Sequence, residues 1–224
     1  MAAAGFYSVL TGTYLRRMEI RGPGRTGRVR LTDVFEALTY RERYEALLRE
    51  TGHDALTGLL DRGRFDREGE GAVREAVVRH RPISLLVVDI DHFKRINDRH
   101  GHAVGDDALR LVAQELSEAV REGDRVYGYG GEEFIVVCEG LPHKAAVVAG
   151  ERLRLGISAL AIAGVDLPIT ASIGVATTPE DGADLKALFA TADARLYEAK
   201  FGGRDRVVGW KPPMPRDESI ISFR

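Results

Sequence analysis

The segment 129–134, Tyr-Gly-Gly-Glu-Glu-Phe, places two glycines beside two carboxylates between two apolar stretches. Gly130 and Gly131 allow the positive φ angles that tight hairpin turns need, and they leave the backbone open to a phosphate group. Glu132 and Glu133 concentrate negative charge at the same point, which suits a divalent cation. The pattern predicts a hairpin tip used in metal-assisted nucleotide chemistry. An ordinary surface hairpin with solvated acids is the alternative interpretation.

A second acidic pair, Asp89 and Asp91, ends an apolar run that begins at Ile83, and Lys94 follows about one helical turn later. We expect at least one of the two carboxylates to emerge at the edge of a sheet. Acid and base would then lie together in a site. The alternative is that Asp91 caps a helix and Lys94 is solvated.

Asn97 and Asp106 bracket residues 98–105, a stretch that is polar and interrupted by glycines. This composition predicts a loop that builds a pocket. An amide and a carboxylate together can pair with the donors and acceptors along the edge of a guanine. In the alternative interpretation, Asp106 only caps the next helix.

Length and composition limit the classes of function. The chain has 224 residues, enough for one domain of about 150 residues and an appendage. Its net charge of -2 provides no field that would attract a nucleic acid polymer. The single cysteine, Cys138, lies in an apolar run and indicates a buried strand residue in a reducing, cytoplasmic compartment. Residues 1–15 fit neither a signal peptide nor a membrane span, so no membrane insertion is expected.

The amino-terminal part differs from the rest of the chain. Residues 1–31 form an appendage in which residues 14–31 predict a hairpin, interpreted as a truncated piece of a sensory module. Residues 32–52 predict a helical linker with an apolar stripe formed by Val34, Ala37, Leu38, Tyr44 and Leu48. The helix either pairs two chains as a coiled coil or packs on its own domain. Residues 211–224 are a carboxy-terminal tail.

Between these ends, the hydrophobic pattern predicts a regular order of elements. A helix around residues 65–77 precedes a strand at 83–88. After this strand come a helix at 106–120, the acidic hairpin, a helix at 144–160, a strand at 169–176, a helix at 185–199 and a short strand at 207–208. This order predicts an α+β fold, a ferredoxin-like or palm-type βαββαβ sandwich whose central, mostly antiparallel sheet is flanked by helices. The first strand can then lie beside the hairpin, bringing Asp89 near Glu132 in a site suited to Mg²⁺.

Five blocks in this order resemble the GGDEF family of diguanylate cyclases. They are residues 54–59 (Asp-Ala-Leu-Thr-Gly-Leu), 89–98 (Asp-Ile-Asp-His-Phe-Lys-Arg-Ile-Asn-Asp), Gly101-His102 with Gly105-Asp106, 130–134 (Gly-Gly-Glu-Glu-Phe), and Ala199-Lys200 with Gly203-Arg204. Each block alone is weak evidence for a family, but all five blocks in this order are specific for one. The resemblance covers residues 54 to 209, almost all of a catalytic domain placed at 53–210.

The resemblance implies that a homodimer condenses two GTP molecules into cyclic di-GMP, each subunit holding one GTP. It assigns Mg²⁺ (or Mn²⁺) to Asp89, the carbonyl of Ile90, Glu132 and Glu133. It makes Glu132 also the base that acts on the ribose 3′-hydroxyl, while Lys94 stabilises charge on the phosphates. The substrate-binding positions that it implies are Phe93, Asn97, His102, Asp106, Gly131, Lys200 and Arg204.

The resemblance also implies a site for inhibition by the product, formed by Arg121, Asp124 and Arg152. A helix end with solvated charges is the alternative. One departure from the family pattern is Gly128, where the family often has arginine, and a milder one is Asp61, where asparagine is common. A catalytically silent receptor for GTP or cyclic di-GMP is therefore the rival function. A cyclase that makes a mixed dinucleotide is a third, against which Asp106 argues because its carboxylate suits the N–H donors of guanine.

Overall fold

The computed structural model describes residues 18–22, 25–29, 38–40, 42–44, 47–48, 50–162 and 168–209. The chain divides into two compact units, Met1–Thr51 and Gly52–Arg224. Among the described residues, no helix is long and apolar enough to cross a membrane.

The first unit contains a hairpin and helical residues. Strands β1 (Met18–Gly22) and β2 (Arg25–Val29) pair antiparallel, which agrees with the hairpin predicted within residues 14–31. Helical residues 38–40, 42–44, 47–48 and 50 agree with the predicted linker helix. Leu38 and Tyr44 of the predicted apolar stripe are exposed, whereas Val34 and Ala37 lie outside the described residues, as does the tail at 211–224. The coiled coil stays a prediction.

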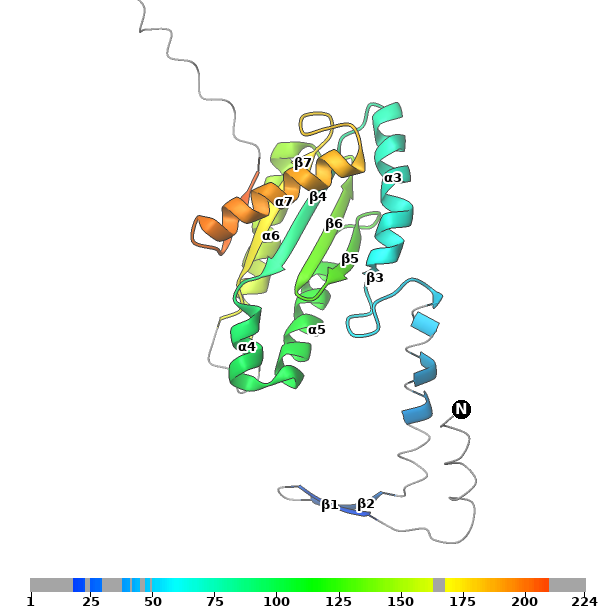
Figure 1. Cartoon of the computed structure of the whole chain (residues 1–224), viewed down its shortest axis with the longest axis vertical. Helices are drawn as coiled ribbons and strands as arrows, with labels where there is room; N and C mark the ends of the chain where they lie inside the picture. The colour runs from blue at the N-terminus through cyan, green and yellow to red at the C-terminus, as the bar shows by residue number, and fades with distance from the viewer. Residues whose placement is uncertain are drawn as a thin grey trace, which may run out of the picture. The chain divides into compact units, whose positions relative to one another are not determined.

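The second unit is an α+β sandwich built on one six-stranded sheet. Its elements in chain order are β3 (Leu60–Asp61), α3 (Arg62–Val78), β4 (Ile83–Ile90), α4 (Phe93–His100), α5 (His102–Ala119), β5 (Arg125–Gly130), β6 (Glu133–Glu139), α6 (His143–Ser158), β7 (Ala171–Thr177), α7 (Leu185–Phe201) and β8 (Arg206–Val208). The strand order is β3-β5-β6-β4-β7-β8. Figure 1 shows β4 in the middle of this sheet, between β6 and β7.

The sheet topology confirms the predicted ferredoxin-like plan. β4 pairs antiparallel with β6 and with β7, and β5 pairs antiparallel with β6. The short strands β3 and β8 join in parallel to β5 and β7. Because the first strand of the plan lies directly beside the hairpin, the acidic end of β4 and the acidic hairpin tip meet at the same end of the sheet, as the sequence predicts.

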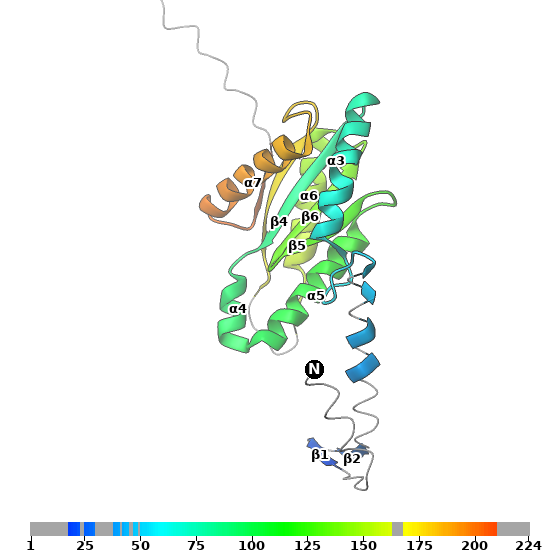
Figure 2. The same ribbon diagram turned by 45° about the vertical axis from the view of Figure 1, so that its right-hand side comes forward.

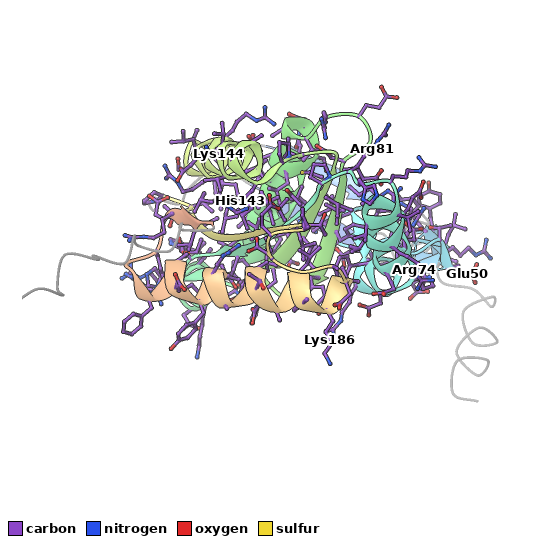
Figure 3. The ribbon with its side chains drawn as sticks, turned by 90° about the horizontal axis from the view of Figure 1, so that it is seen from above. Glu50, Arg74, Arg81, His143, Lys144 and Lys186 are labelled. Atoms are coloured by element: carbon purple, nitrogen blue, oxygen red, sulfur yellow. The ribbon has the colours of Figure 1, made fainter. Side chains whose placement is uncertain are left out.

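Helices cover both faces of the sheet because side chains along each buried strand alternate between two cores. On one face, Leu86 and Val88 of β4 pack with α5 and α6. On the other face, Leu85 and Val87 pack with α3 and α7. Figures 2 and 3 show these layers, with α7 and α3 on one side of the sheet and α5 and α6 on the other. By the same alternation, Asp89 points to the α3 and α7 face.

Helix α7 lies unusually close to strand β7 at Gly174. A Cβ atom at this residue would lie 2.0 Å from the carbonyl oxygen of Ala192 and 2.4 Å from the backbone nitrogen of Leu196. Only glycine therefore lets the backbones of strand and helix approach so closely. This contact sets the height of α7 over the sheet and so the position of Lys200 in its last turn.

A buried ion pair links α7 to the loop that precedes it. Arg195 donates to both carboxylate oxygens of Asp181 at 2.7 Å, and also to the carbonyl oxygen of Val175 at 2.6 Å. The Arg195 and Asp181 side chains are 13% and 4% exposed, so the bidentate pair is shielded from water. His143, labelled in Figure 3, lies near the same carboxylate, with Nδ1 3.7 Å from Asp181 Oδ2. This network fixes the loop that leads from β7 into α7.

Two predictions about local structure were wrong. The polar stretch 98–105 is not a loop: α4 runs to His100 and α5 starts at His102, with Gly101 (φ 85°) as the only residue between them. Polar residues fit there because one side of each helix faces solvent. Asp106 consequently lies inside α5 and does not cap it.

Candidate active site

The site forms where the end of β4 meets the tip of the β5–β6 hairpin. Asp89 lies opposite Glu133 in the antiparallel register, and the N–H of Ile90 donates to the carbonyl oxygen of Glu132 at 3.2 Å. The hairpin turns through Gly130 (φ 153°) and Gly131 (φ 58°), and positive φ angles of this kind favour glycine. The sheet therefore brings Asp89, Glu132 and Glu133 together.

Lysine from α7 completes this cluster. Lys200 Nζ lies 2.7 Å from Asp89 Oδ2. Burial, the largest influence, raises the pKa of Asp89 to about 6; Lys200 acts in the opposite direction, and the charges of Glu132 and Glu133 add to the rise. Two acids beside one buried carboxylate make a site that favours a cation. The ammonium of Lys200 supplies one positive charge there.

These residues fit a divalent cation by their chemistry, since carboxylate and carbonyl oxygens are the ligands that Mg²⁺ and Mn²⁺ take. Among the described residues, no group of three or more acidic, histidine or cysteine side chains is already arranged as a metal-binding cluster. Asp89 instead holds Lys200.

The expectation that one carboxylate of the Asp89 and Asp91 pair emerges at the sheet edge was wrong, because both residues are only 5% exposed. Asp91 does not cap α4 either: the cap position is His92, in a left-handed conformation. The Asp91 carboxylate accepts hydrogen bonds from the hydroxyl groups of Thr170 (2.8 Å) and Ser172 (2.7 Å) and from the backbone N–H of Asp205 (3.0 Å). These partners are 79, 81 and 114 residues away in the sequence.

The predicted guanine-binding residues lie on the two helices α4 and α5. Asn97 lies directly over Gly105: a Cβ atom at Gly105 would be 1.9 Å from Asn97 Oδ1. Glycine at this position therefore gives the Asn97 amide its place. Asp106 is half-buried one residue later, and His102 is exposed at the start of α5.

Two further predicted residues lie in the first turn of α4. Lys94 is exposed to solvent. The Phe93 ring is 8% exposed and packs in the core beneath the helix. The structure thus places Lys94 on the surface and Phe93 below it.

Arg204 lies in the turn that links α7 to β8. Three consecutive residues of this turn have positive φ angles, Gly203 (111°), Arg204 (62°) and Asp205 (45°). Lys200 and Arg204, the residues predicted to bind phosphate, are therefore separated by the end of a helix and a sharp turn. Only Lys200 has a direct contact to the acidic cluster among the described interactions.

The residues predicted to form the inhibitory site also gather in one place. Arg121 Nε donates to Asp124 Oδ1 at 3.2 Å, and the Arg121 guanidinium also donates to the carbonyl oxygen of Glu139. Arg152 on α6 donates to the carbonyl oxygen of Ala119 at 2.7 Å. All three charged groups act on Cys138: burial and then Asp124 raise the pKa of this thiol to about 12, while the two arginines oppose the rise. As predicted, Cys138 is a buried strand residue.

Gly128 faces the loop that carries the first of the five blocks. A Cβ atom at this residue would lie 3.6 Å from Asp54 Cβ and 3.8 Å from Thr57 Oγ1, which are ordinary contact distances. The Asp54 carboxylate accepts from the N–H and the hydroxyl of Thr57 at 2.8 and 2.7 Å. Asp61, the other departure, caps α3 by accepting from the N–H of Arg64 at 2.7 Å. Asparagine would accept the same bond.

Sequence reasoning missed the partners of Asp91 and the role of Gly105. The alternation of side chains along β4 was a signal that Asp91 shares a face with Asp89. Nothing in the sequence indicated that Thr170, Ser172 and Asp205 would converge on it.

Comparison with known proteins agrees with this geometry. The family model described as "Diguanylate cyclase, GGDEF domain" matches residues 51–206. Diguanylate cyclase DgcM of Escherichia coli is 35% identical over 196 residues, which are 88% of this chain and 46% of DgcM. Response regulator PleD of Caulobacter vibrioides is 39% identical over 160 residues, 70% of this chain and 35% of PleD. The chain thus spans less than half the length of either relative.

Solved structures show the same fold. The coiled coil and GGDEF domain of DgcB from Caulobacter crescentus, in complex with c-di-GMP, superposes with a TM-score of 0.66 at 32% identity, covering 79% of this chain and 95% of that one. The active GGEEF domain of a diguanylate cyclase from Vibrio cholerae superposes with a TM-score of 0.63 at 28% identity, covering 66% and 94%. By sequence, by fold and by the acidic hairpin beside β4, the chain belongs to the GGDEF domain family of diguanylate cyclases.

Proposed function

We propose that this chain is a diguanylate cyclase that joins two GTP molecules into cyclic di-GMP and releases two pyrophosphates. The observation that carries the proposal is the convergence of Asp89, the hairpin acids and Lys200 at the end of β4. The relatives DgcM and DosC, both named diguanylate cyclases, support it. GTP as substrate is consistent with a cytoplasmic protein.

In the reaction, a ribose 3′-oxygen attacks the α-phosphorus of the other GTP, the bond to the β-phosphate breaks, and pyrophosphate leaves. Glu132 accepts the proton of the 3′-hydroxyl. Lys94, Lys200 and Arg204 offset negative charge on the phosphates. When bound at Asp89, the Ile90 carbonyl, Glu132 and Glu133, Mg²⁺ or Mn²⁺ supplies further positive charge to the triphosphate.

The guanine base is held by Asn97, His102 and Asp106, with Phe93 and Gly131 lining the site. Groups that pair with guanine are left without partners by adenine, so GTP is preferred to ATP. Since each subunit binds one GTP, two subunits must face each other as a homodimer. We also propose that cyclic di-GMP inhibits the enzyme by binding at Arg121, Asp124 and Arg152, whose guanidinium groups suit phosphate and guanine acceptors.

The test is incubation of the purified chain with GTP and Mg²⁺, followed by chromatography for cyclic di-GMP. Glu132→Gln should lower the rate at least 100-fold, in the range of lost general-base catalysis. Glu70→Gln, on the exposed side of α3, is the matched control and should leave the rate unchanged. Product formation by Glu132→Gln at the parental rate would remove Glu132 from the mechanism.

Glycine at position 128, where the family often has arginine, favours a second candidate function. This candidate is a silent receptor that binds GTP or cyclic di-GMP without reaction. A concentrated parent chain that binds either nucleotide and makes no product would select the receptor. Gly128→Arg distinguishes the cause, because a Cβ atom at this position meets Asp54 and Thr57 only at ordinary contact distances. A gain of activity in this variant would assign the loss to the missing arginine.

A further inference from the structure

Asp91 is a buried carboxylate that the proposed mechanism does not use. Its Oδ1 accepts from Ser172, and its Oδ2 accepts from both Thr170 and the N–H of Asp205. With three donors on two oxygens, the carboxylate is held in place and is a poor base or metal ligand. Its role is therefore to hold other groups.

The groups that it holds come from two elements. Ser172 lies in β7, the strand next to β4, and Thr170 immediately precedes that strand. Asp205 lies in the turn after α7, one residue beyond Arg204. Asp91 thus ties the end of β4, two residues from Asp89, to the turn that carries a residue predicted to bind phosphate.

That turn needs external support. Arg204 (φ 62°) and Asp205 (φ 45°) are consecutive residues with side chains in a conformation that L-residues rarely adopt. Such strain persists only where surrounding contacts hold it. Four hydrogen bonds do so. The N–H of Arg204 donates to the carbonyl oxygen of Ala199 (3.0 Å), and Arg206 Nε donates to the carbonyl oxygen of Arg204 (2.9 Å). The N–H of Asp205 donates to Asp91, and Arg154 on α6 donates to Asp205 Oδ1 (2.6 Å).

We propose that Asp91 is a positioning residue that fixes the 203–205 turn, and with it Arg204, for binding the triphosphate of GTP. The inference rests on the proposed function, because that function makes the triphosphate the ligand of Arg204. Asp91 acts through the backbone of its neighbour Asp205 and does not touch the substrate. It therefore contributes to affinity for the phosphates and not to recognition of the base.

The test compares two ligands, 3′-deoxy-GTP, which cannot condense because it lacks the attacking hydroxyl, and guanosine, which lacks phosphates. Asp91→Asn keeps one acceptor oxygen and replaces the other by an NH₂ donor, so it cannot accept from Thr170, Ser172 and Asp205 together and holds the turn less firmly, with little change in volume. This variant should bind 3′-deoxy-GTP at least tenfold more weakly and guanosine within twofold of the parent. The double variant with Arg204→Ala should bind 3′-deoxy-GTP less than twofold more weakly than the weaker-binding of the two single variants, as expected for residues that act as one unit.

Two controls separate positioning from general stability. Ser172→Ala removes the donor to Oδ1 and leaves the bond between Oδ2 and Asp205, so its affinity for 3′-deoxy-GTP should stay within 1.5-fold of the parent. Arg154→Ala releases the same turn through its other anchor, and should weaken 3′-deoxy-GTP about threefold with guanosine unchanged. Arg154→Ala keeps the test decisive if Asp91→Asn does not fold.

Three results would each overturn the inference. The first is an equal loss of affinity for guanosine and for 3′-deoxy-GTP, and the second is a loss of affinity that adds to that of Arg204→Ala. The third is an unchanged affinity for 3′-deoxy-GTP in Asp91→Asn or Arg154→Ala. The same binding assay on the parent separates it from the proposed function. A parent that binds 3′-deoxy-GTP but makes no cyclic di-GMP from GTP refutes the enzyme alone, and the comparison of variants still decides the role of Asp91. A parent that binds neither nucleotide refutes both.

Discussion

Lys200 and Asp89 form an ion pair of 2.7 Å between the last turn of α7 and the end of β4. The Asp89 side chain is 8% exposed, and the acids of the hairpin tip lie close enough to raise its pKa further beyond the effect of burial. Lys200 thus compensates part of the negative charge that the fold gathers at this point. The fold accepts an electrostatic cost at the site where a cation and a triphosphate are proposed to bind.

The raised pKa of Asp89 predicts a pH-dependent difference between the parent and Asp89→Asn in the metal-free state. Between pH 4 and 6 the folded parent binds a proton at Asp89 that the unfolded chain has already released. Raising the pH through this window removes that proton from the folded state, so the free energy of unfolding falls. The parent should lose up to about 3 kcal/mol relative to Asp89→Asn between pH 4 and pH 7, following about 1.4 kcal/mol per pKa unit. Urea unfolding in the presence of EDTA measures this difference, and parallel pH profiles for the two proteins would contradict it.

Gly105→Ala should impair recognition of guanine without unfolding the domain. The added methyl group would lie 1.9 Å from Asn97 Oδ1, so the flexible end of the Asn97 side chain must move away. The KM for GTP should rise about tenfold, as for a lost hydrogen bond to the base, and Asn97→Ala should give a similar value. Steady-state kinetics of both variants and of the double variant check this. If the two effects simply add, Gly105 does not act through Asn97.

Gly174→Ala should prevent α7 from packing. A methyl group there would overlap backbone atoms of Ala192 and Leu196, which cannot move without displacing the helix. We expect a loss on the order of 4 kcal/mol or more in the free energy of unfolding. Gly71→Ala is the matched control, since its added methyl group meets nothing within 4 Å in helix α3 and should stabilise by about 0.5–1 kcal/mol. Thermal and urea unfolding of both variants give the comparison.

Arg195→Ala should cost about 3–5 kcal/mol because it leaves the buried Asp181 carboxylate without its bidentate partner. Arg79→Ala removes an ion pair with Glu75 that has a similar distance of 2.9 Å but exposed side chains of 61% and 60%. That variant should change stability by less than about 0.5 kcal/mol. The contrast tests burial as the cause, and it fails if the two variants unfold at the same urea concentration.

The sequence predicts the elements that depend on local pattern. Strand β4, the hairpin and helix α7 follow from apolar periodicity and from glycines at the turn, and the ferredoxin-like order follows from their succession. The same reasoning predicted a loop at 98–105, because glycine and polar residues indicate loops even where a single residue, Gly101, is enough to join two helices.

Contacts between distant residues explain the remaining errors. The burial of Asp91 depends on Thr170, Ser172 and Asp205, which alternation along one strand cannot reveal. The place of Asn97 depends on the absence of a side chain at Gly105 in another helix. Both are consequences of packing. Periodicity predicts which face of an element is buried, but it does not predict which residues that face contacts.

The two outermost strands of the sheet are brief. On one side β3 joins through only Leu60 and Asp61, and on the other β8 joins through the three residues 206–208. Short edge strands offer few unpaired backbone N–H and carbonyl groups to a strand of another molecule. The fold thereby limits the tendency of copies of this domain to join edge to edge into an extended intermolecular sheet.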